Sequence, residues 1–215
     1  MDLGANVWLL IAVTLFEILF IVIPASISAK IEGTSFHQEL NNMGLEFQNN
    51  PIRIKVQRIV LGLAVGFGFF SIGRYIAFFF RNIIIEQIFG SSYIQQAQEG
   101  SINTTPISPN LLQLVILIIL QIFLVGLCEE AFFRGFLLSK LNYKFTPVSS
   151  ALISSLFFAF YHVPPFLVPL STIITFFGYY FTFGILLSLL YRFSNNSLLP
   201  CIVAHSFFNS LLLFL

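Results

Sequence analysis

Long runs of apolar residues, interrupted by short polar stretches, make up most of this chain. The runs lack the strict alternation of a half-buried strand, and they are too continuous for a helix with one water-facing side. Most are close to the ~20 residues that an α-helix needs to cross a lipid bilayer. The pattern predicts an all-α fold, a polytopic membrane helix bundle with about six transmembrane helices. The predicted spans are Asn6–Ala29, Ile59–Phe80, Leu111–Leu141, Pro147–His162, Phe166–Tyr191 and Leu198–Leu215.

The composition agrees with a membrane location. Of the 215 residues, 57% are hydrophobic and 9% are charged, whereas about 25% are charged in a soluble globular protein. We therefore expect a single integral membrane domain over residues 1–215, with the lipid bilayer as its surroundings. The net charge of +1 predicts no nucleic-acid partner. A secretory signal is a weaker interpretation of the first run, because Asp2 is the only charge before it and the run is too long.

Positive charges gather on one side of the predicted spans. Seven of the ten Lys and Arg residues fall in the loops after the first, third and fifth spans, and only Arg81 falls in the opposite loops. These loops should be cytoplasmic, which places both termini and the polar loop Asn82–Asn110 outside. The seven basic residues are Lys30, Arg53, Lys55, Arg58, Lys140, Lys144 and Arg192.

Three ionisable residues, Glu129, Glu130 and Arg134, interrupt the third predicted span. Each costs roughly 2.5–3.5 kcal/mol at the centre of a membrane helix on insertion scales, so such residues usually face a polar interior and are functional candidates. Glu130 and Arg134 are four residues apart and can pair on one helix face. The pair would hold Glu129 in place and offset its charge.

Two later spans carry polar residues at a similar depth. Counted from the basic loops with the helical rise, Glu129 lies roughly 16 Å deep, His162 roughly 24 Å and His205 roughly 14 Å. His205 and Asn209 are one turn apart on the same helix face. Polar groups from three spans are therefore expected to meet near the middle of the bilayer.

This set of residues is suited to hydrolysis of an amide bond, which requires an activated water, a proton donor for the leaving amine and stabilisation of the oxyanion. Glu129 can act as general base, and His162 can hold the same water and share its proton. His205 and Asn209 supply N–H donors for a tetrahedral oxyanion.

Other chemistries have less support. The sequence has no GxSxG elbow, no Ser-x-x-Lys pattern and no HExxH zinc motif. Two histidines and a carboxylate could still bind a metal, but Glu129 and Glu130 project about 100° apart on a helix and cannot easily share one ion. We therefore expect no cofactor, with zinc as the minority alternative. Cys128 and Cys201 are interpreted as small buried hydrophobes.

The motifs resemble those of the CPBP intramembrane proteases, which include the type II CAAX prenyl endopeptidases and the Abi bacteriocin-immunity proteins. The family signature is EExxxR, FxxxH and HxxxN on successive helices. It is present here, within about 111–215, as Glu129-Glu130 with Arg134, Phe158 with His162, and His205 with Asn209.

The resemblance implies a metal-independent, glutamate-dependent endopeptidase. In it, Glu129 and His162 activate water, while His205 and Asn209 form the oxyanion hole. The substrate would be a membrane-associated peptide or protein, with or without a lipid, and the short chain fits a prokaryotic plasma membrane. A non-catalytic scaffold or immunity factor on the same fold is the alternative.

Two further charged residues inside spans, Glu17 and Arg74, are left outside the catalytic set. They are expected to pair with each other or to lie near helix ends with their charges directed towards water. A transporter would show a repeated pair of broken helices, and no internal repeat is visible.

Overall fold

The structure is a computed structural model that describes residues 2–45 and 51–214. In these ranges the chain is helical apart from turns, loops and one isolated bridge between Asp2 and Asn103. The α-helices are α1 (Val7–Leu15), α2 (Leu19–Glu32), α3 (Phe36–Asn42), α4 (Ile52–Phe78), α5 (Glu86–Phe89), α6 (Ser91–Glu99), α7 (Leu111–Leu120), α8 (Gly126–Glu130), α9 (Ser139–Asn142), α10 (Pro147–His162), α11 (Leu170–Phe193) and α12 (Leu198–Leu212). They are joined by a 3-10 segment, η1 (Phe16–Ile18), and by π-helical segments η2 (Phe79–Ile85), η3 (Gln121–Val125) and η4 (Ala131–Leu138).

Four continuous helices within the described ranges are long and apolar enough to cross a membrane: Val7–Glu32, Ile52–Phe89, Leu111–Asn142 and Leu170–Phe193. The predicted fourth and sixth spans are also helical but shorter, with 16 residues in α10 and 15 in α12. Each short helix is roughly 24 Å long or less, compared with ~30 Å for the hydrocarbon core of a bilayer. The prediction of an all-α, polytopic bundle is confirmed, and the structure distinguishes four long helices from two short ones.

Three predicted boundaries are wrong. The second span begins at Ile52 instead of Ile59. The expected loop Asn82–Asn110 is largely helical, because η2 and α5 extend the second span to Phe89 and α6 follows. Gly90 separates α5 from α6 with a φ of 85°, a value that only glycine adopts without strain. The fifth span begins at Leu170 instead of Phe166, because three prolines between positions 164 and 169 keep the preceding residues out of the helix.

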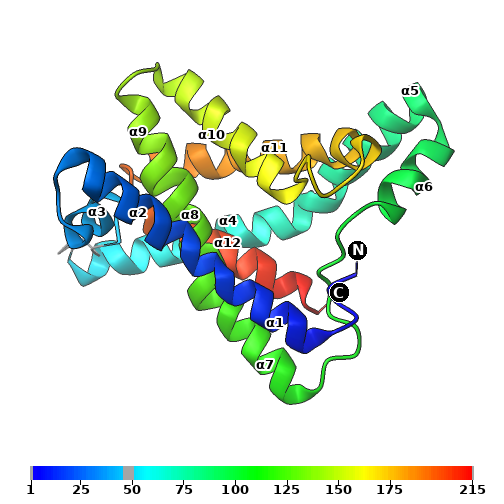
Figure 1. Ribbon diagram of the computed structural model, residues 1–215, viewed down its shortest axis with the longest axis horizontal. Coiled ribbons are helices and arrows are strands. Elements are labelled where there is room, and N and C mark those ends of the chain that lie inside the picture. Colours follow the sequence, from blue (N-terminus) through cyan, green and yellow to red (C-terminus); the bar gives the residue numbers. More distant parts are fainter. Residues whose placement is uncertain (1, 46–50, 215) are drawn as a thin grey trace.

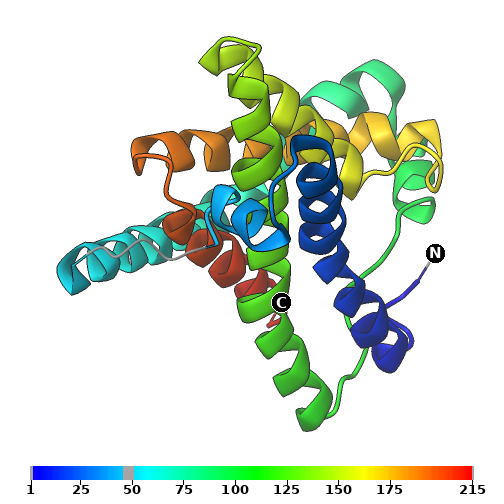
Figure 2. The same cartoon turned by 60° about the vertical axis from the view of Figure 1, so that its left-hand side comes forward.

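The helix Leu111–Asn142, made of α7, η3, α8, η4 and α9, is the central helix of the molecule (Figure 1). Turned by 60°, the view shows the N-terminal helix on one side of it and α12 on the other (Figure 2). In agreement, α2 packs against α8 and η4, and α12 packs against η3 and α8. α10 packs against α11 and η4. Segments far apart in the sequence therefore surround α8.

Glycines bring α4 and α12 into close contact. A Cβ atom on Gly66 would lie 2.6 Å from the carbonyl oxygen of Ala204 in α12. Small residues at such positions let membrane helices approach until their backbones touch. This contact helps to fix α12, which carries His205, against the rest of the bundle.

The Gly66→Ala substitution is expected to destabilise the protein by about 1–3 kcal/mol, because the added methyl group meets backbone that cannot rotate away. Gly68→Ala is the matched control, since a Cβ atom there meets no atom within 4 Å. The control should leave stability unchanged or raise it by up to about 1 kcal/mol. Thermal unfolding of the two variants in detergent measures the difference, and equal stabilities would contradict the close contact.

Candidate active site

The two adjacent glutamates lie in the short segment α8, which is flanked on both sides by π-helical segments. π-Helical turns are rare and occur frequently at functional sites. A Cβ atom on Gly126 would lie 2.2 Å from Ser206 Oγ, so this glycine allows α12 to approach α8 closely. Glu130 follows Gly126 by one turn and therefore faces α12 as well.

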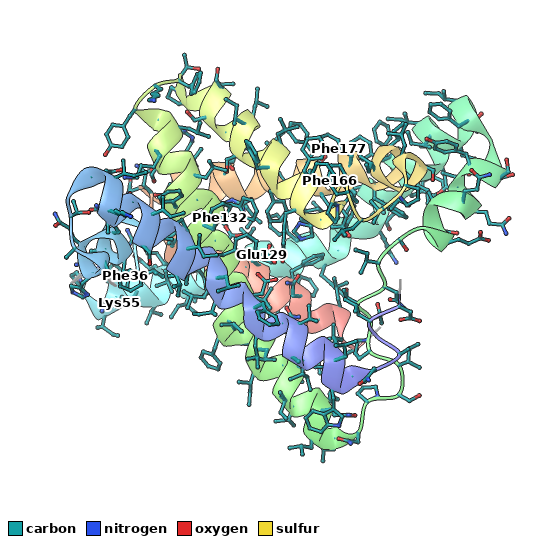
Figure 3. The ribbon with its side chains drawn as sticks, in the orientation of Figure 1. Phe36, Lys55, Glu129, Phe132, Phe166 and Phe177 are labelled. Atoms are coloured by element: carbon teal, nitrogen blue, oxygen red, sulfur yellow. The ribbon has the colours of Figure 1, made fainter. Side chains whose placement is uncertain are left out.

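Glu129 lies near the centre of the molecule, beside α12 (Figure 3). Its Oε2 atom is 3.8 Å from Nε2 of His162 and 3.9 Å from Nε2 of His205. The carboxylate is 4% exposed, and Oε2 is buried with no hydrogen-bond partner among the described residues. The predicted meeting of α8, α10 and α12 at one polar centre is confirmed for these three side chains.

Glu130 joins this centre to the arginine of the same helix. Its Oε1 atom accepts a hydrogen bond from Arg134 Nη1 at 2.9 Å, and both side chains are fully buried. Arg134 Nη2 also donates to the carbonyl oxygen of Gly184 in α11 at 3.0 Å. The predicted pairing of Glu130 with Arg134 is confirmed.

Glu130 also orients His205. Its Oε1 atom lies 2.8 Å from His205 Nδ1, so the Nδ1 proton is donated to the carboxylate and Nε2 is directed towards Glu129. A carboxylate that holds one ring nitrogen sets the tautomer and direction of the imidazole. We therefore assign Glu130 two tasks, pairing with Arg134 and orienting His205.

His162 is held by its own helix and by aromatic neighbours. Its Nδ1 atom is 2.9 Å from the Phe158 carbonyl oxygen, which directs the lone pair of Nε2 towards Glu129. The ring stacks on Tyr180 of α11, with ring centroids 4.5 Å apart. Tyr180 was missed from the sequence, because a tyrosine in an apolar helix carries no signal of which ring it will meet.

Asn209 is bonded to the central helix. Its Nδ2 atom donates a 3.1 Å hydrogen bond to Gln121 Oε1 in η3, which is the side-chain partner that the structure gives it. Sequence reasoning missed Gln121, although an amide inside an apolar span was an available signal.

Of the two alternatives expected for Glu17 and Arg74, their pairing with each other is wrong. Glu17 Oε1 accepts a hydrogen bond from the hydroxyl of Tyr161, the residue before His162. Arg74 Nη2 donates to Tyr75 at 2.8 Å, on the exposed side of α4. The two residues are separated because α1 and α2 pack on the central helix, whereas α4 packs on α12.

A second polar cluster joins α2, α3 and α9 around a cavity of about 400 Å³. Lys140 Nζ is bonded to Glu32 and lies 3.6 Å from Oε2 of the buried Glu39. The pKa of Glu39 is lower than its usual value. Burial by itself would raise this pKa, but hydrogen bonds such as that from Thr34, together with the charge of Lys140, outweigh the effect of burial. The cluster fastens α3 to the central helix and lies outside the catalytic set.

In the described ranges, no group of three or more His, Cys, Asp or Glu side chains has the arrangement of a metal site. Cys128 and Cys201 are free and buried, as predicted.

The helical bundle and its buried polar centre define a polytopic integral membrane protein with a site suited to hydrolysis. Residues 111–211 match the protein-family model described as type II CAAX prenyl endopeptidase Rce1-like. This match supports the resemblance to the CAAX and CPBP membrane proteases that the three motifs predicted. The match begins at the first residue of α7, so α1–α6 lie outside it. No curated protein and no solved structure matches the chain.

Proposed function

We propose that the protein is an intramembrane endopeptidase that uses a water molecule activated by Glu129 and His162. The observation that carries this proposal is the geometry at Glu129 Oε2, a buried acceptor without a hydrogen-bond partner that lies within 3.9 Å of two imidazole nitrogens. A water between Glu129 and His162 would meet two acceptors, because His162 presents a lone pair at Nε2. Such a water is oriented by both groups.

In the proposed reaction, Glu129 takes a proton from this water as the water oxygen attacks the carbonyl carbon of the peptide bond. The resulting tetrahedral intermediate carries a negative oxygen. Glu129 then returns the proton to the nitrogen of the leaving amine as the C–N bond breaks. The products are a new carboxylic acid and a free amine, and the carboxylate of Glu129 is restored.

We propose that His205 stabilises the oxyanion, because its Nε2 atom lies 3.9 Å from the carboxylate oxygen that would bind the water. For Nε2 to donate while Nδ1 donates to Glu130, the ring must carry both protons, and Glu130 is close enough to balance that charge. Asn209 serves as a second donor in this proposal. It must then exchange its bond to Gln121 for one to the oxyanion.

We further propose that catalysis needs no metal. Cleavage by the purified protein is expected to persist after incubation with a strong zinc chelator, because a carboxylate and two imidazoles suffice for the steps above. The measurement is the initial rate with chelator, without it, and after zinc is added back. Activity that is lost to the chelator and restored by zinc would move the reaction to a metal site.

The substrate we propose is a membrane-associated peptide or protein. The matching family model is described as a prenyl endopeptidase, which suggests a substrate that carries a prenyl group. Fluorogenic peptides in prenylated and unprenylated forms should therefore be compared in nanodiscs. Cleavage of either form that disappears in Glu129→Gln supports the proposed function. Absence of cleavage by the folded protein, across a broad peptide library, would favour the non-catalytic alternative. A prokaryotic plasma membrane remains our prediction for its location.

A further inference from the structure

The N-terminal helix lies outside the family match but brings a carboxylate close to the site. Glu17 lies in the 3-10 segment η1, near the middle of the span Val7–Glu32. A carboxylate at this depth costs roughly 2.5–3.5 kcal/mol on insertion scales, so it needs a polar partner inside the bundle. Short 3-10 segments within a longer helix often mark a functional hinge or local strain.

The N-terminal helix holds Tyr161 at two points. The Tyr161 hydroxyl donates its proton to Glu17 Oε1, and the second oxygen, Oε2, is buried without a hydrogen-bond partner in the described structure. Phe20, about one turn after Glu17, packs edge-on against the Tyr161 ring with centroids 4.8 Å apart. The ring and the hydroxyl of Tyr161 are therefore both fixed from the same helix.

Tyr161 in turn borders the imidazole that faces Glu129. Its ring packs edge-on against His162, with centroids 5.1 Å apart and planes at 84°. Tyr180 stacks on His162 at 4.5 Å, with planes at 29°. These two rings confine the imidazole. Removal of the hydrogen bond between Glu17 and Tyr161 would allow the Tyr161 ring to move.

We propose that Glu17 is a positioning residue of the active site: through its hydrogen bond to Tyr161, it fixes the direction of the His162 imidazole. The kinetic part of this inference rests on the proposed function. The hydrogen bond that the structure gives Glu17 is to Tyr161, so its effect on His162 passes through that residue. The N-terminal helix is thereby a structural part of the site, although no family motif lies in it.

The first test compares Glu17→Leu, Tyr161→Phe and the double variant in the peptide-cleavage assay. Each single variant should lower kcat about tenfold with little change in KM, because misdirection of a catalytic group by less than about 1 Å already has effects of this size. The double variant should be no slower than the single ones, since all three remove the same hydrogen bond. Glu17→Gln should retain activity, because its amide oxygen can still accept the bond.

Thr14→Val is the matched control on the same helix. Its hydroxyl donates to the Leu10 carbonyl within its own helix, so kcat should not change. Two results would overturn the proposal: kcat unchanged in Glu17→Leu and Tyr161→Phe, or effects that multiply in the double variant. A Glu17→Gln variant as slow as Glu17→Leu would also overturn it, because the charge and not the hydrogen bond would then matter.

The second test does not depend on activity. The chain has three histidines, so ¹⁵N-imidazole NMR of histidine-labelled protein gives signals that single His→Asn variants can assign. Glu17→Leu should shift the His162 signals and leave those of His37 unchanged. If the wild type shows no Glu129-dependent cleavage, the proposed function fails, and this spectrum alone decides the positioning role. An unchanged His162 signal in Glu17→Leu would reject it.

Discussion

The Glu129→Gln variant is expected to lose at least about a thousandfold in kcat/KM for peptide cleavage. General base catalysis contributes roughly 10²–10⁴-fold, and glutamine keeps the size of glutamate but cannot take a proton from water. Two imidazole nitrogens remain near the position. In the proposed state His205 Nε2 is a donor, because its ring carries both protons. His162 Nε2 still accepts a hydrogen bond from the water, but a neutral imidazole does not replace the charge of the carboxylate.

The same variant should be at least as stable as the wild type. Glu129 Oε2 has no hydrogen-bond partner in the described structure, and a neutral amide is less costly to bury than a carboxylate. Thermal unfolding in detergent measures this together with kcat/KM. Glu99→Gln is the control, because Glu99 is exposed at the end of α6 and its replacement should leave both quantities unchanged. Retention of more than about a tenth of the activity in Glu129→Gln would reject the role of general base.

Replacing Arg134 by methionine is expected to destabilise the protein by about 3–5 kcal/mol. Both members of the Glu130–Arg134 pair are fully buried, and removal of one member leaves an uncompensated charge inside the bundle. Removal of Arg134 also leaves the carbonyl oxygen of Gly184 without the hydrogen bond that Arg134 Nη2 donates to it. Denaturation in detergent micelles, followed by circular dichroism, measures the change in the free energy of unfolding.

The double variant Glu130→Gln with Arg134→Met should recover part of that stability, because no unpaired charge remains. Its activity should stay low, since His205 loses the carboxylate charge that balances its doubly protonated ring. Arg74→Met is the control for an arginine within a span. Arg74 is exposed and bonded only to Tyr75 in the described contacts, so a change within about 0.5 kcal/mol is expected. Similar decreases in the free energy of unfolding for Arg134→Met and Arg74→Met would contradict a special contribution of the buried Glu130–Arg134 pair to stability.

The central residues of the site could be predicted because their signals are local. Charges and imidazoles stand out in apolar helices, and the four-residue spacing of Glu130 and Arg134 is sufficient to predict their pairing. The helical rise then placed Glu129, His162 and His205 at comparable depths. A depth along the helix axis depends only on counting residues, and it does not require knowledge of the packing.

The partners from other helices could not be predicted in this way. Tyr161 and Glu17 are separated by 144 positions in the sequence, and Asn209 and Gln121 by 88. Each contact depends on how far a helix is rotated about its axis and where it crosses its neighbour. Rotation and crossing are set by the interlocking of side chains from several helices at once, including the close approaches at glycines such as Gly66 and Gly126.

The sequence by itself determined the all-α membrane class, the order of the helices, the resemblance to a protease family and the central acid and imidazole groups. These follow from hydrophobicity, spacing and depth, which are properties of single helices. Only the tertiary structure decided that Glu130 directs His205, that Asn209 is held by Gln121, and that Glu17 reaches the site instead of Arg74. These are contacts between helices, and their geometry comes from packing across the whole bundle.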